Sequence, residues 1–205
     1  TIFCVVGIMN AFNMMDGING LCSGCAMIAL MLIGFFSGLI YDSMLVLIIG
    51  SMIGFVLFNM GIFGKKRGVF LGDSGSNLVG FWVAWIAIYA SQSEIYSIQP
   101  ITVLWFVAIP LLDCIGLIYS RTKKGRSWSD AGRDHIHHKL QSLTNSSSKT
   151  LAGLLILGLL FAGLGVFIEK SYLSSEVSFV LFLILAVLFY ISSSRISNSQ
   201  VEIPN

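Results

Sequence analysis

The chain has 205 residues, of which 56% are hydrophobic and 11% are charged, and its formal net charge at pH 7 is +2. A soluble globular domain carries roughly 25% charged residues, so the composition excludes that class and indicates a membrane protein with several spans. The small net charge gives no reason to expect a nucleic-acid partner.

Charged residues divide the chain into apolar runs. The opening run, 1–15, is too short to cross a bilayer, and because it begins with Thr1 we expect it to be the cut end of a longer helix. A bilayer core needs about 20 apolar residues and disfavours ionised groups. The sequence therefore predicts an all-α, polytopic integral membrane helical bundle, one domain over 1–205. Its six complete transmembrane helices lie in uncharged runs: 17–41, 43–64, 74–93, 95–112, 150–168 and 177–194.

Lysine and arginine predict the orientation of these helices. If the loop 10–21 is cytoplasmic, alternation places 62–76, 119–149 and the C-terminal tail on the same side. These three segments hold eleven of the twelve basic residues, and only Lys170 lies outside them. By the positive-inside rule, the polar loops face the cytoplasm.

The first polar stretch reads NAFNMMDGINGL and begins at Asn10. Asn10, Asn13 and Asp16 recur every third residue, so on a helix they fall within about 120° of arc and form a polar stripe. Gly17 and the Asn19-Gly20 pair then end the helix, because both are strong turn signals. A solvated turn would explain the glycines, but polar side chains at membrane depth are costly unless they face protein, ions or water. The stripe is therefore a candidate site.

The second motif is VFLGDSGSN, residues 69–77, at the start of a long apolar run. Asp73 or Ser74 could cap the following helix, because their side-chain oxygens accept hydrogen bonds from its free N–H groups. Alternatively, a carboxylate here could hold Mg²⁺ while the helix N-terminus faces a phosphate. The motif alone does not decide between a cap and a metal site.

Three histidines cluster in the third motif, GRSWSDAGRDHIHHKL, where His135, His137 and His138 follow Arg133. A zinc site is one alternative, but HxHH lacks the usual fourth ligand and Arg133 opposes a cation. Recognition of a diphosphate is the other, because arginine offers a bidentate fork and imidazole a donor near neutral pH. The pattern favours the diphosphate.

One carboxylate, Asp113 in AIPLLDCIG, lies inside an apolar helix. Such a group costs roughly 2.5 to 3.5 kcal/mol at the centre of a bilayer, so it should be paired or face a polar cavity. Pairing with Arg121 two turns on, pairing with a neighbouring helix and lining a site all stay open.

The order of the motifs is NxxNxxDGxNGL, then VFLGDSGS, then GRS…RDHIHH, each between apolar runs. In this order the whole chain resembles the polyprenyl-phosphate N-acetylhexosamine-1-phosphate transferases, above all the bacterial branch that loads GlcNAc-1-phosphate onto undecaprenyl phosphate. The resemblance implies a Mg²⁺-dependent reaction, with Mn²⁺ as an alternative metal, in which the lipid phosphate displaces UMP from a UDP-sugar. It also implies the bacterial inner membrane, an active site on its cytoplasmic face, a first step of cell-surface polysaccharide synthesis and an assembly that is often a homodimer.

The resemblance also assigns roles to residues. Asn13 and Asp73 correspond to the Mg²⁺ ligands, and Asp16 to an acidic residue on the same helix face. Asn19 falls where the family contacts uracil, and Phe70 where a phenylalanine stacks on it. The loop that holds the diphosphate and the sugar corresponds to Arg133, His135, His137 and His138. Asn10 is either a substrate contact or a helix-packing residue.

Three departures from the family pattern bear on these roles. The family's adjacent aspartates upstream of the NxxN helix are absent, so we expect residues 1–205 alone to be inactive. The usual GRSPFSPDRxHxHH reads GRSWSDAGRDHIHH, with Trp128-Ser129 for Pro-Phe and Gly132 for an aspartate, which changes the sugar loop. Asn19 replaces a common aspartate, but an amide both donates and accepts and can still pair with uracil.

Three other interpretations stay open. Within the family, the donor could be UDP-MurNAc-pentapeptide, although HIHH favours GlcNAc over the run of three histidines typical of that enzyme. The chain could instead be a transporter or channel, but Asp113 and the polar stripe lie near cytoplasmic ends rather than along a path. The third is a non-catalytic relative that binds lipid phosphate, which an upstream aspartate pair in the full-length protein would argue against.

Overall fold

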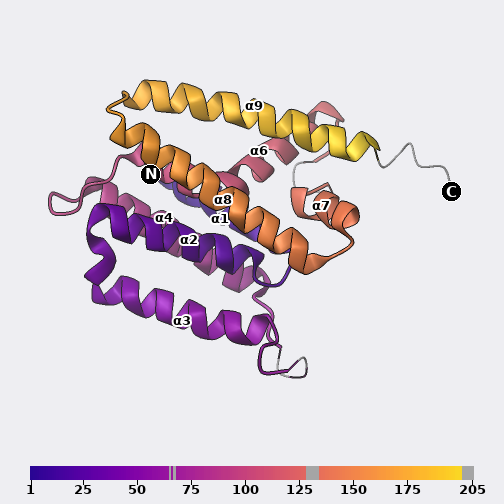
Figure 1. Ribbon diagram of the computed structural model, residues 1–205, viewed down its shortest axis with the longest axis horizontal. Coiled ribbons are helices and arrows are strands. Elements are labelled where there is room, and N and C mark those ends of the chain that lie inside the picture. The colour runs from indigo at the N-terminus through magenta and orange to yellow at the C-terminus, as the bar shows by residue number, and fades with distance from the viewer. Residues whose placement is uncertain (65, 67, 128–133, 200–205) are drawn as a thin grey trace.

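The computed structural model describes residues 1–64, 66, 68–127 and 134–199 (Figure 1). Over these residues the chain is helical and has no strand, which confirms the predicted all-α class. A short 3-10 turn covers Leu39–Tyr41, and the helices are α1 (Ile2–Met15), α2 (Leu21–Ser37), α3 (Ser43–Asn59), α4 (Gly72–Gln92), α5 (Pro100–Phe106), α6 (Ala108–Lys123), α7 (Ile136–Thr144), α8 (Ser147–Lys170) and α9 (Ser175–Ser199).

Each predicted apolar run contains a helix, but the helices are shorter than several of the runs. In the described part of the chain, α8 and the Ser175–Ile196 part of α9 are each long and apolar enough to cross a membrane, and α5 with α6 makes a third crossing if counted as one bent span. α2 and α3 have 17 residues each, at the lower limit for a span. The run 17–41 is longer than α2 because turns occupy both of its ends.

The helix predicted over 95–112 is instead two helices that meet at an angle of 81°. Pro110 has no N–H to donate, and in a continuous helix its ring would clash with the carbonyl of Phe106. The helix therefore ends at Phe106 and restarts at Ala108, where Pro110 falls in the first turn. The predicted boundaries are wrong at both ends, since α5 begins at Pro100 and α6 continues to Lys123.

α1 and α4 pack closely and run antiparallel. Gly80 of α4 allows this approach, because a Cβ there would lie 2.7 Å from the Cα of Met9. On the same side of α1, Phe12 and Met15 are fully buried in the core. This packing places the C-terminal end of α1 beside the first turn of α4.

The polar loops gather at one end of the bundle, as the charge pattern predicts. Figure 1 shows the α1–α2 turn, the α3–α4 connection, α7 and the C-terminal end of α9 on the same side of the molecule, opposite the N-terminus of α1. Motifs that lie far apart in the chain therefore meet at this end.

Candidate active site

Asn13 is fixed at the junction of α1 and α4. The buried Ser76 hydroxyl donates to Asn13 Oδ1 over 2.6 Å. An amide oxygen has two lone pairs, so this bond leaves one of them for a further ligand. Sequence reasoning did not single out Ser76, although it lies in the GDSGS motif three residues after Asp73.

Two carboxylates flank this junction. Asp16 follows the last residue of α1, and Asp73 is exposed in the first turn of α4. Burial raises the pKa of Asp16, the negative charge of Asp73 raises it further, and a hydrogen bond with the Gly72 backbone partly offsets both. The helix begins at Gly72 without a side-chain cap, so of the two alternatives for this motif the capping role of Asp73 or Ser74 is not what the structure shows.

The chemistry of this junction fits a magnesium ion. Asn13, Asp16 and Asp73 offer amide and carboxylate oxygens, which are the ligands that Mg²⁺ prefers. After burial, the negative charge of Asp73 is the second cause of the raised pKa of Asp16, and a divalent cation near the two carboxylates would offset that charge.

The buried amide of Asn59 connects the α1–α2 turn to the α3–α4 connection. Its Oδ1 accepts from the Gly20 N–H over 2.7 Å, and its Nδ2 donates to the Val69 carbonyl over 2.8 Å. Asn19 precedes Gly20 and Phe70 follows Val69, so the two hydrogen bonds of Asn59 fix the backbone beside both candidate base contacts. Sequence reasoning missed Asn59; the available signal was a polar residue near the end of an apolar run.

Both candidate base contacts are accessible. The Phe70 side chain is 84% exposed, and Asn19 lines a pocket of about 390 Å³ between the α1–α2 turn and the start of α8. An exposed aromatic ring and an exposed amide near a pocket are compatible with stacking on a base and pairing with it.

His137 docks the third motif onto the first. Its ring is 1% exposed and touches Gly17, where a Cβ would overlap the ring nitrogen Nε2. Burial lowers the pKa of His137 to about 4, with a smaller contribution from the charge of His138, so the ring is neutral at pH 7. Gly17 is therefore required for space as well as for the turn.

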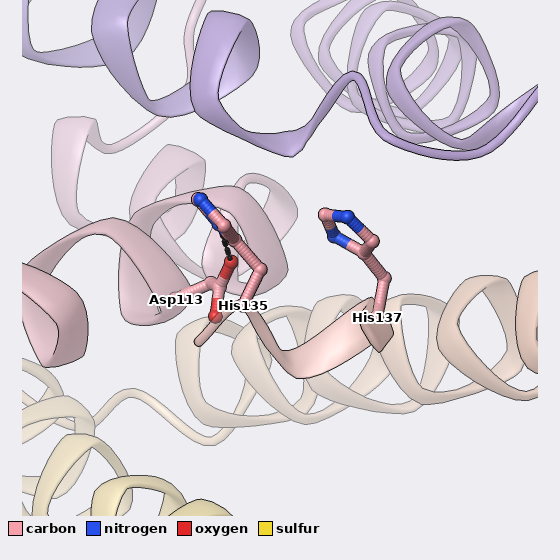
Figure 2. Close-up of side chains that lie close together, drawn as sticks. All are labelled: Asp113, His135 and His137. Atoms are coloured by element: carbon pink, nitrogen blue, oxygen red, sulfur yellow. Dashed lines mark hydrogen bonds and ion pairs between the residues drawn. The ribbon is translucent and has the colours of Figure 1, made fainter. Parts of the chain in front are cut away.

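His135 is held from below by Asp113 (Figure 2). One carboxylate oxygen of Asp113 lies 3.0 Å from His135 Nδ1, and the other accepts from the Ile136 N–H over 2.9 Å. Asp113 is 5% exposed, so this pair is screened from water. The structure thus shows Asp113 paired with the start of a neighbouring helix, and it also places Asp113 in the lining of a pocket of about 360 Å³.

The three imidazole rings form one cluster, with centroids 4.3 to 6.3 Å apart. Ligand atoms of Asp113, His135 and His137 lie within 4.8 Å of one another, which is close enough to consider a metal. However, His135 Nδ1 and both Asp113 oxygens are already engaged in the hydrogen bonds above. The geometry therefore favours a hydrogen-bonded unit over the zinc alternative.

The structure does not place two of the predicted site residues, Asn10 and Arg133, in this arrangement. Asn10 is exposed one turn back along α1, so it is not a helix-packing residue in this structure. Arg133, together with the departures at Trp128 and Gly132, lies outside the described residues. Of the predicted set, the structure gathers Asn13, Asp16, Asn19, Phe70, Asp73 and the three histidines at one end of the bundle.

Comparison with known proteins agrees with this arrangement. Residues 1–91 match the family described as glycosyl transferase family 4. The chain is 36% identical over 194 residues, 92% of its length, to the undecaprenyl-phosphate alpha-N-acetylglucosaminyl 1-phosphate transferase of Escherichia coli K12. The chain therefore matches glycosyl transferase family 4 over residues 1–91 and is similar to this transferase over most of its length.

Other members are similar to the chain to the same degree. The Yersinia pestis protein of the same name is 37% identical over 93% of the chain, and that of Haemophilus influenzae is 35% identical over 71%. The chain covers 53% of the Escherichia coli and Yersinia proteins and 41% of the Haemophilus protein, so it spans about half the length of the relatives it matches. No solved structure matches it.

Proposed function

We propose that the full-length protein transfers a sugar-1-phosphate, GlcNAc-1-phosphate in our assignment, from a UDP-sugar to undecaprenyl phosphate and releases UMP. The observation that carries this proposal is the meeting of Asn13, Asp16 and Asp73 at one helix junction, with the histidine helix docked on Gly17. The names of the relatives support undecaprenyl phosphate as the acceptor.

In this reaction an oxygen of the lipid phosphate attacks the sugar-bearing phosphorus of the UDP-sugar. The bond to the bridging oxygen breaks, and UMP leaves with that oxygen. Phosphoryl transfer depends on in-line placement and on neutralising charge. Mg²⁺, held by Asn13 and Asp73 with Asp16 beside them, would neutralise the diphosphate when bound; Mn²⁺ has the same ligand preferences.

The chain's own residues position the donor. Phe70 and Asn19 hold the uracil, and the Asn59 amide keeps their two segments together. We assign recognition of the diphosphate and the sugar to the three histidines, His135, His137 and His138, and to Arg133, which lies outside the described residues. His137 is neutral at pH 7 and almost fully buried, so we assign it a packing role in this region and not that of a cation.

We place the protein in the bacterial inner membrane with this end in the cytoplasm, where UDP-sugars are made. The abundance of Lys and Arg in the loops at the site end supports this orientation. The product would start a cell-surface polysaccharide on its lipid carrier.

The test is UMP release by full-length protein with undecaprenyl phosphate, Mg²⁺ and a panel of UDP-sugars. We expect turnover with UDP-GlcNAc and much slower turnover with UDP-MurNAc-pentapeptide. UMP release with UDP-MurNAc-pentapeptide but not with UDP-GlcNAc would overturn the sugar assignment. No turnover with any UDP-N-acetylhexosamine, from protein shown to be folded, would overturn the reaction.

A further inference from the structure

The buried carboxylate of Asp113 contacts the His135 ring and the backbone that follows it. It lies in α6, 22 residues before His135, and its two oxygens have two separate partners. We propose that Asp113 is a positioning residue that fixes both the orientation and the tautomer of His135. The functional consequence rests on the proposed function, in which His135 faces the diphosphate.

The first oxygen controls the ring. A carboxylate only accepts hydrogen bonds, so His135 Nδ1 must carry a proton to donate across the 3.0 Å contact. In the neutral ring, Nε2 is then an unprotonated acceptor, and in the charged ring it is a second donor. Asp113 thus decides which nitrogen is presented to the substrate. Carboxylates that orient metal-binding histidines work in the same way.

The second oxygen controls the backbone that carries the ring. It accepts from the Ile136 N–H, the first N–H of α7, which has no acceptor within its own helix. His135 immediately precedes α7, so this bond fixes the start of the helix as well as the residue before it. One buried side chain therefore sets both the position of the backbone and the rotation of the imidazole.

The fixed ring stacks on His137, which contacts the turn after α1. The His135 and His137 rings are stacked, with centroids 5.3 Å apart and planes 24° apart. In Figure 2 both side chains rise from the same side of α7 toward the purple ribbon of the N-terminal helices. His137 touches Gly17, the residue after Asp16, so the stacked pair connects His135 to this turn through His137.

This arrangement also explains why an ionisable group is kept within an apolar helix. An asparagine could accept from the Ile136 N–H with its single oxygen, but it would have no second oxygen to accept from His135 Nδ1. Its NH₂ group would then face His135 Nδ1 and force the proton onto Nε2. Only a carboxylate satisfies both donors at once.

The spectroscopic test uses full-length protein with ¹⁵N-labelled histidine, and His135→Gln identifies the His135 signals. In the wild type we expect Nδ1 of His135 to be protonated, and in Asp113→Asn we expect the proton on Nε2. An unprotonated Nδ1 in the wild type would overturn the proposal without any variant. This readout does not require activity, so it stands even if the proposed reaction fails.

The kinetic test compares the same variant with wild type. Asp113→Asn should lower kcat by at least about tenfold and leave the KM for the UDP-sugar within about twofold, because the Asp113 carboxylate bonds to His135 and Ile136 and not to Asn19 or Phe70. In a His135→Ala background, the same substitution should have no further effect. An unchanged kcat in folded Asp113→Asn protein, or an equal loss with and without His135, would contradict the positioning role.

Asp113→Glu serves as a second variant if Asp113→Asn does not fold. Its longer carboxylate keeps the acceptor but moves it, so we expect Nδ1 to stay protonated while kcat falls. A glutamate variant with the proton on Nε2 would overturn the proposal.

Discussion

The contact between Gly17 and His137 joins the first and third motifs, and it is possible because glycine has no Cβ. The His137 ring fills the space where a Cβ of residue 17 would lie, and it is almost fully buried there. The sequence predicts Gly17 as a turn residue, and the structure adds a steric reason that depends on a residue 120 positions later. Turn chemistry is local and readable, whereas a long-range contact of this kind is not.

Gly17→Ala should push the histidine helix away from the catalytic junction. The added methyl group overlaps the His137 ring, so we expect UMP release to fall at least about tenfold while the protein still folds. The matched control is Gly7→Ala in α1, where a Cβ meets nothing within 4 Å and activity should be retained. Equal activity in the two variants would contradict the contact.

His137 should also make stability depend on pH. Its pKa is lowered by burial from 6.5 to about 4, so between these values the unfolded chain binds a proton that the folded protein does not. The free energy of unfolding should therefore fall as the pH drops from 6.5 to 4, by up to about 3 kcal/mol. The measurement is the melting temperature of full-length protein from pH 7 to 4.5, with His137→Gln as the comparison. Identical pH slopes for the two proteins would rule the effect out.

At the scale of elements, the site depends on short connections held by buried polar side chains. Asn59 at the end of α3 bonds to the turn before α2 and to the segment before α4, so one amide sets the distance between three helices. The apolar runs predict where the helices lie. They cannot predict which amide joins them, because that depends on the packing of residues 10 and 39 positions away.

Asn59→Asp should weaken donor binding more than turnover. The aspartate keeps an acceptor for the Gly20 N–H but places an oxygen against the Val69 carbonyl, which costs roughly 1 to 3 kcal/mol for the lost bond. We expect the KM for the UDP-sugar to rise about tenfold or more in steady-state assays. Ser51→Ala, which removes a hydroxyl bonded within α3, should leave KM unchanged. A KM effect of the same size in both variants would argue against the role of Asn59.

For the whole molecule, the sequence predicts the class and the end of the bundle that bears the site, because hydropathy and charge are distributed over long segments. It does not predict the break at Val107, which results from Pro110 within an otherwise ordinary apolar run, nor the pairing of Asp113 with His135. The structure brings the three motifs to one end. Residues 1–91 match glycosyl transferase family 4, and the chain spans about half the length of the relatives to which it is similar.

The central claim is that the α1–α4 junction is the catalytic metal site, and the most direct measurement is UMP release by full-length Asp73→Asn protein. We expect turnover to fall by about 100-fold or more, because the variant removes a charged ligand. Asp42→Asn is the matched control, since Asp42 caps α3 away from the site and asparagine caps a helix equally well. Turnover in Asp73→Asn equal to that of Asp42→Asn and the wild type would contradict the account.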